Sequence, residues 1–404
     1  MKQKSGTMIR NWMSISLFLL FLSSILGLWM RYEIYSASLI LPFKHILHAH
    51  SHTALLGFGF LFILGAYMFT VIPSGVEKRV FYRYAVVYSI AVVGMTLSFL
   101  YQSYGAISIS FSTIAMILAY IMIARFLREY RNIDEKLKNP LIRWSTYWFL
   151  ISTLGIWFIG PVTAVLGRGH ELYFLSIQFF LHFQFNGWFT YSALGLLIYV
   201  SRKGGLKVRI SPTGVTLLHI SLVLTYFLSV IVVDKHPIFF ALNSLGVALQ
   251  LLAYFLIFTP IVKFQIRQSD PGRWVSWIIL TGIFCLTLKV LVQGLVISPV
   301  LATVSYSVRE FIVGYIHLIL LGGMTITLGG ILLRNRILPD NIFAQIGWIG
   351  LIITFIVTET VLFAHAIATW QGVGNASLFV QTIFYTTLPF PVFTGCIAYA
   401  ARKK

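Results

Sequence analysis

Runs of about 20 apolar residues, separated by short polar and basic segments, recur along the whole chain. About 20 residues is the length at which an α-helix crosses the ~30 Å hydrocarbon core of a bilayer. The pattern therefore predicts an all-α integral membrane protein that forms a single polytopic domain over residues 1–404. We expect twelve spans, near residues 11–30, 46–72, 80–102, 105–126, 143–166, 172–200, 212–233, 237–260, 273–298, 309–333, 343–368 and 378–400.

Composition and charge agree with a membrane protein. The chain is 58% hydrophobic and 10% charged, whereas a soluble domain carries about 25% charged residues. The net charge of +19 could suggest a nucleic-acid partner, but its distribution argues against one. If the N-terminus is cytoplasmic, the positive-inside rule is satisfied at every loop, so we expect both termini in the cytoplasm. The Lys and Arg residues outside this pattern are Arg31, Lys44, Arg168, Lys235, Arg309 and, within a span, Lys289.

Several classes are excluded by the same data. The two cysteines form no CxxC or CxxCH motif, so we expect no covalently attached haem, thiolate zinc site or disulfide framework. We find no convincing internal repeat. The expected surroundings are membrane lipid and no nucleic acid, in the inner (cytoplasmic) membrane of a bacterium.

The ten histidines are distributed unevenly. In the predicted topology all but His219 lie toward the outer side, and four fall between Lys44 and His52. His52, His182 and His317 lie on three different spans at a similar depth, ~12–15 Å from the outer surface at 1.5 Å per residue. Ionisable side chains are costly inside a bilayer, and imidazole is the commonest metal and haem ligand. The pattern therefore indicates metal or haem chemistry.

Helical spacing separates the histidines of the second span. His48 and His52 share a face, whereas His50 points elsewhere. Glycines follow His52 and His317 within the next six residues, and glycine lets a neighbouring backbone or a flat macrocycle approach closely. We expect the more superficial His45, His170 and His236 to be hydrated by headgroup water.

Two intramembrane charges stand out, Lys289 and Glu359, at about equal depth. They could form a packing ion pair, or a proton-relay or cofactor-contacting pair, since a lone charge there is costly. Arg31 and Arg309 lie at the predicted outer mouth. They could bind carboxylates such as haem propionates or anchor the helix ends.

Three motifs resemble subunit I of the haem-copper oxidase superfamily, in its cytochrome-c-dependent oxidase and nitric oxide reductase branch. They are the stretches 48–58 (HAHSHTALLGF), 182–188 (HFQFNGW) and 315–322 (YIHLILLG). The chain is also similar to NnrS-type membrane haem proteins of the nitric-oxide response. The resemblance implies a twelve-helix bundle and one low-spin haem b with two histidine ligands, His317 and a histidine of the second span. His52 is the first choice for that second ligand and His50 the alternative, while His182 corresponds to a copper ligand.

The chain departs from that family at the oxygen-reducing centre. Tyr315 stands where the family has a second span-10 histidine, and there is no His-His dipeptide for the copper ligands. We therefore expect electron transfer, or oxygen or nitric oxide chemistry or sensing, rather than terminal oxidase activity. The candidate catalytic residues are His182, Tyr315, Lys289 and Glu359, and the candidate metal ligands are His48, His52, His182 and His317.

An active protein would be an oxidoreductase fed by a cytochrome or a quinol, with or without partner subunits, and copper could accompany the haem. Two alternatives stay open. One is a metal-ion transporter lined by the outer histidines, with Lys289 and Glu359 coupling protons. The other is a copper-binding membrane protein without haem that uses His45, His48, His52 and His182.

Overall fold

A computed structural model of the chain describes residues 2–38, 40–73, 78–207, 210–270 and 273–403, with side chains from residue 7 onward. Every regular element in these ranges is a helix, which confirms the predicted all-α class. The chain divides into two compact units, which we describe separately. Unit 1 comprises Met1–Glu135, Leu328–His365 and Asn375–Lys404, and unit 2 comprises Lys136–Thr327 and Ala366–Gly374.

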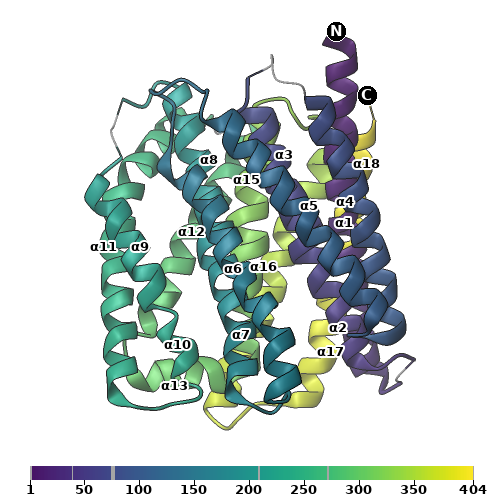
Figure 1. Ribbon diagram of the computed structural model, residues 1–404, viewed down its shortest axis with the longest axis vertical. Coiled ribbons are helices and arrows are strands. Elements are labelled where there is room, and N and C mark those ends of the chain that lie inside the picture. Colours follow the sequence, from purple (N-terminus) through teal and green to yellow (C-terminus); the bar gives the residue numbers. More distant parts are fainter. Residues whose placement is uncertain (1, 39, 74–77, 208–209, 271–272, 404) are drawn as a thin grey trace. The chain divides into compact units, whose positions relative to one another are not determined.

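Unit 1 holds the first four spans and the last two (Figure 1). Its helix α1 packs on α18, where the Ser24 and Thr394 hydroxyls lie 2.8 Å apart, and on α17, where the Tyr35 and Tyr385 hydroxyls lie 3.0 Å apart. Helices α1 and α18 are antiparallel, so the start of α1 and the end of α18 lie at the same end of this unit. Its elements are α1 (Lys2–Ser36), α2 (Phe43–His52), η1 (Thr53–Gly59), α3 (Phe60–Thr70), α4 (Lys78–Gln102), α5 (Ala106–Tyr130), α15 (Thr327–Arg334), α16 (Ile342–Trp370), α17 (Ala376–Thr387) and α18 (Pro389–Arg402).

Unit 2 holds the central spans, and its helices begin with recognisable caps. Asn139 caps α6 ahead of Pro140 by accepting the Leu141 N–H, a common helix start. Its side-chain amide also donates to the Gly195 carbonyl at 2.8 Å. The elements are α6 (Pro140–Val165), α7 (Glu171–His182), η2 (Phe183–Phe189), α8 (Thr190–Lys203), α9 (Pro212–Leu224), α10 (Phe227–Val230), α11 (Pro237–Gln268), α12 (Trp274–Leu295), α13 (Pro299–Ser307), α14 (Arg309–His317) and η3 (Leu318–Ile326).

Eleven helical stretches of the described chain are long and apolar enough to cross a membrane. They coincide with eleven of the predicted spans to within a few residues at most ends. The remaining predicted span, 172–200, is helical from Glu171 to Lys203 but is not among the eleven. It carries His182, Gln184 and Asn186, whose polarity lowers its hydropathy. The count of twelve spans and the cytoplasmic placement of both termini stay predictions.

Three π-helical segments interrupt the spans that carry the deep histidines. η1, η2 and η3 each begin directly after a histidine, namely His52, His182 and His317. All seven residues of η1 and all seven of η2 are buried. π-segments inside α-helices are rare and are frequent at functional sites. The three spans therefore share a local architecture that hydropathy does not reveal.

The same three spans share a spacing of one histidine and two glycines. Each contains a histidine, a glycine five residues later and a second glycine eight residues after that: His52/Gly57/Gly65, His182/Gly187/Gly195 and His317/Gly322/Gly330. Each is preceded by one plain helix that packs against its π-segment, since α1 contacts η1, α6 contacts η2 and α12 contacts η3. The sequence similarity is confined to these sparse positions.

Candidate functional site

His50 is held against helix α1 in unit 1. Its Nδ1 lies 2.8 Å from the backbone carbonyl of Ser23, one turn before Gly27. Because a carbonyl only accepts, Nδ1 carries the proton and Nε2 keeps its lone pair. Gly27 lies beneath the ring, where an added Cβ would come within 3.0 Å of Cε1. A fixed tautomer and a fixed ring plane are what a metal- or haem-ligating histidine requires.

His48 and His52 face the other side of α2 and form a cluster with two aromatic residues of unit 1, Phe99 at the end of α4 and Tyr104 in the α4–α5 turn. We call His48, His52, Phe99 and Tyr104 the outer cluster. The ring centroids of His48 and His52 lie 6.1 Å apart. The centroids of His48 and Tyr104 are separated by 4.5 Å, and those of His52 and Phe99 by 4.4 Å. The His52 Nδ1 donates to the His48 carbonyl at 2.9 Å, and its Nε2 lies 3.2 Å from the Tyr104 hydroxyl. The Nε2 lone pair of His52 is therefore directed at the phenol.

Unit 2 contains a connected chain of five polar side chains, which we call the polar chain. It runs from His182 through Asn186, Tyr315 and Gln293 to Lys289. Asn186, Gln293 and Lys289 are buried, and His182 and Tyr315 are partly buried. Asn186 Nδ2 lies 3.5 Å from His182 Nδ1, and the Tyr315 hydroxyl lies 3.2 Å from Asn186 Oδ1 and 2.7 Å from Gln293 Oε1. Lys289 donates to the same Gln293 oxygen at 2.7 Å. Three of the four candidate catalytic residues thus lie in one connected network.

The two ends of the polar chain differ. At one end, His182 Nε2 donates to the Leu222 carbonyl at 2.8 Å, so its tautomer is fixed. At the other, Lys289 is 1% exposed and makes its hydrogen bond to an amide rather than to a carboxylate. Its expected partner Glu359 lies on α16 in unit 1 and is also buried. Since the two residues belong to different units, the ion pair stays a prediction.

One buried acid was missed by the sequence reading, which had named only Lys289 and Glu359 as buried charges. Glu33, in the last turns of α1, is 1% exposed. One carboxylate oxygen accepts the Trp29 indole N–H at 2.8 Å, and the other accepts the Ile40 backbone N–H at 2.9 Å. It is thus a structural carboxylate that fastens the connection between α1 and α2.

The remaining expected ligands occupy helix ends. His317 is the last residue of α14 and directly precedes η3, and Arg309 is the first residue of α14, both in unit 2. Arg31 lies near the end of α1 in unit 1. His50 and His52 belong to unit 1 and His317 to unit 2, so their pairing across a haem remains an expectation from the sequence.

The superficial histidines mostly have structural partners. His170 and His236 cap helices α7 and α11 by accepting the backbone N–H of the residue two positions later, at 3.1 and 3.2 Å. His45 donates to the Leu100 carbonyl at 3.0 Å, and His365 stacks on Phe379 with centroids 3.9 Å apart. Helix capping, and not hydration alone, therefore accounts for His170 and His236. In unit 2, His219 lies 3.2 Å from the Tyr191 hydroxyl and close to two tryptophans.

The glycines that follow the deep histidines serve helix packing in their own units. A Cβ on Gly57 would come within 2.8 Å of Val92 on α4, and one on Gly323 within 3.1 Å of Leu286 on α12. Of the two roles the sequence allowed, close approach of neighbouring helices is thus the one supported at these positions.

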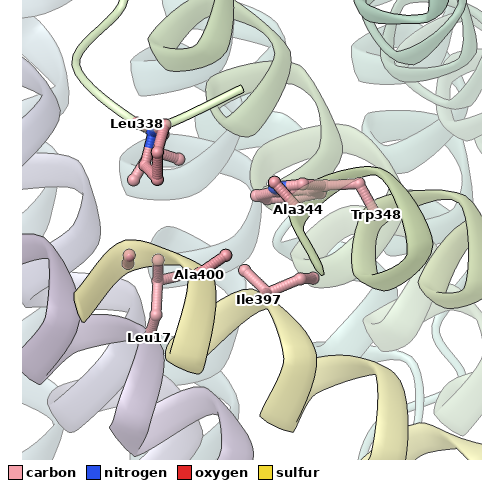
Figure 2. Close-up of a pocket in the computed structure, with 8 residues that line it drawn as sticks. Leu17, Leu338, Ala344, Trp348, Ile397 and Ala400 are labelled. Carbon is pink, nitrogen blue, oxygen red and sulfur yellow. The ribbon is translucent and has the colours of Figure 1, made fainter. Parts of the chain in front are cut away.

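Three features of the described residues bear on the metal chemistry. No three His, Cys, Asp or Glu side chains in the described ranges gather closely enough to hold a metal ion. Cys285 and Cys396 are not joined in a disulfide within the described residues. A pocket in unit 1 is apolar, so it supplies no charged group or metal donor (Figure 2). It is lined by Leu17, Leu338, Pro339, Ala344, Trp348, Ile397, Ala400 and Ala401.

Sequence reasoning missed Phe99, Tyr104 and Gln293 as partners of the candidate residues. Gln293 could have been found, because it stands four residues after Lys289 and so shares its helix face. Tyr104 could not, because it lies in a turn between two spans and only the fold brings it to His52. Comparison of the chain with protein-family models and with curated proteins finds no match in either.

Proposed function

We propose that the chain is a membrane haem protein that holds one b-type haem between His317 and a histidine of the second span, and that it transfers electrons. The observation that carries the proposal is the hydrogen bond from His50 Nδ1 to the Ser23 carbonyl, together with the Gly27 surface beneath the ring. Histidines that ligate metals almost always donate their other ring N–H to such a carbonyl or carboxylate.

These contacts favour His50 over His52 as the ligand from the second span. The His52 Nε2 lies within 3.2 Å of the Tyr104 hydroxyl, and its Nδ1 bond is made within its own helix. His50 instead is fixed by a neighbouring helix, which sets the ring plane independently of motions in α2. The pairing with His317 rests on the resemblance of the sequence motifs, in which His50 is the alternative to His52.

The protein's own contribution would be to orient the ligands and to exclude water. Of the eleven membrane-length helices, those that bear His50 and His317 are the most enclosed. In their apolar 18-residue stretches, 94% and 83% of the residues are buried. A haem with two histidine ligands carries single electrons and has no open position for a gas molecule unless a ligand leaves. Electron transfer between a cytochrome or quinol and an acceptor therefore suits this ligand set better than oxygen reduction.

The test is an optical spectrum of the detergent-purified protein, oxidised and dithionite-reduced, with haem extraction and a copper assay on the same sample. We expect one haem b per chain with sharp reduced α and β bands. His50→Ala and His317→Ala should abolish these bands while the protein still inserts, and His52→Ala should retain them. A colourless wild-type protein would refute the proposal, and loss of haem in His52→Ala with retention in His50→Ala would reverse the ligand assignment.

A further inference from the structure

The outer cluster has the donors of a metal site that the haem proposal does not use. His48 and His52 are separated by four residues on one face of α2, the spacing at which two helical histidines chelate one metal ion. Tyr104, 41% exposed, borders both rings and keeps the cluster open at the surface of unit 1. Phe99 is fully buried and closes the inner side.

The ring geometry is compatible with a shared ion. In a histidine complex the metal lies about 2.0–2.1 Å from the ring nitrogen, so each ring centroid lies ~3.2 Å from it and two such centroids are at most about 6.4 Å apart. The centroids of His48 and His52 are 6.1 Å apart. The separation of the two rings is therefore within the range that a shared metal ion allows.

The two ring nitrogens of His52 have suitable partners. His52 Nδ1 donates to a backbone carbonyl, which leaves the Nε2 lone pair on the side of Tyr104. That pattern orients a metal-bound imidazole and increases its basicity. The Tyr104 oxygen, now 3.2 Å from Nε2, is close enough to become a third donor or to bond to a metal-bound water.

We propose that His48, His52 and Tyr104 form an open binding site for a divalent transition-metal ion, with Cu²⁺ as the preferred ion and Zn²⁺ as a weaker one. Two imidazoles and a phenol suit these ions, and Cu²⁺ binds nitrogen and oxygen donors most tightly of the first-row divalent series. Ca²⁺ and Mg²⁺ require oxygen ligands, above all carboxylates, and should not compete. The site stands apart from the proposed haem, whose ligands are His50 and His317.

The test is titration of metal-stripped, tag-free protein with CuCl₂, followed by equilibrium dialysis and electron paramagnetic resonance. We expect one tightly bound Cu²⁺ per chain, with hyperfine splitting from two nitrogens. His48→Gln and His52→Gln should each weaken binding by more than about a hundredfold, because loss of an outer partner alone costs about 10–100-fold. Tyr104→Phe should weaken it less and change the spectrum.

The matched control is His45→Gln, because His45 lies on the same helix and is engaged by the Leu100 carbonyl; it should bind copper like the wild type. His50→Gln should lose haem and retain copper, so failure of this site and failure of the haem proposal are distinguishable. Absence of stoichiometric copper in the wild type would overturn the proposal. A loss of copper affinity in His45→Gln equal to that in His48→Gln would also overturn it. A wild-type spectrum without couplings to two nitrogens would do the same, and that measurement does not depend on the folding of any variant.

Discussion

Replacement of Lys289 by methionine tests whether the polar chain ends in an uncompensated amine. Lys289 is 1% exposed, and its hydrogen bond goes to Gln293 Oε1 at 2.7 Å. A lysine amine has two or three N–H donors depending on its protonation; besides this hydrogen bond, its nitrogen lies over the Tyr315 ring at 6.0 Å from the centroid. Methionine has a similar unbranched shape and no donors. Gln293 would still accept from the Tyr315 hydroxyl, so the substitution creates no new unsatisfied acceptor.

The size of the effect follows from the terms that change. The variant loses one hydrogen bond to a charged group, worth about 1.5–3 kcal/mol, and is relieved of a desolvation cost of several kcal/mol. We expect a net stabilisation of about 1–4 kcal/mol, the range found when buried ion pairs are replaced by apolar residues of similar volume. For a unit of roughly 200 residues, each kcal/mol raises the unfolding midpoint by about 2–4 °C. Thermal unfolding of wild type and Lys289→Met in the same detergent measures this shift.

The opposite result would refute the reasoning. If Lys289 pairs with Glu359, removal of one partner leaves a buried charge and should destabilise by about 3–5 kcal/mol. In that case Lys289→Met combined with Glu359→Gln should recover part of the loss, and a double-mutant cycle would measure the coupling. Gln293→Leu is the control, because it removes the acceptor of Lys289 and should destabilise in either case.

Three further predictions concern single contacts. Gly27→Ala would place a methyl group within 3.0 Å of His50 Cε1. Because overpacking costs about 1–3 kcal/mol, we expect haem affinity to fall by about tenfold or more. Haem titration measures this affinity, and an unchanged value would exclude His50 as the ligand. Glu33→Gln replaces one of the two buried acceptor oxygens with an amide N–H₂ that cannot accept, so it should lower the unfolding midpoint by a few degrees, with no change in the haem spectrum. His219→Ala should leave the haem bands intact but lower stability by about 1–3 kcal/mol, because the Tyr191 hydroxyl loses its partner; loss of haem would contradict the predicted depth of His219.

The sequence predicted the spans well because their signal is local. A run of apolar residues ends at charged and capping residues, and the helix bounds Phe43–Thr70 and Lys78–Gln102 lie within three residues of the predicted ones. The π-segments could not be predicted in this way. They change the hydrogen-bond register of the backbone without changing which residues are apolar.

The candidate site was predicted in residue type but only partly in arrangement. Periodicity correctly separated His50 from His48 and His52 on α2, and the structure adds that His50 is bonded to Ser23 whereas His52 faces Tyr104. Those partners come from another helix and from a turn, and no spacing within one span indicates them. The same holds for the polar chain, where Asn186 and Gln293 on different helices meet the Tyr315 hydroxyl.

Two of the three spans that share the histidine and glycine spacing differ in what their histidines contact. His52 is directed at a phenol near the surface, whereas His182 is bonded to a backbone carbonyl and to a buried amide. The scaffold is therefore repeated while the chemistry of each copy is set by the neighbouring helices. If this is correct, a substitution in a residue that contacts the histidine should change the chemistry of a span more than the position of the histidine itself does. Removal of Tyr104 should alter copper binding and leave the haem unchanged, while removal of the Tyr315 hydroxyl should affect only the polar chain of unit 2.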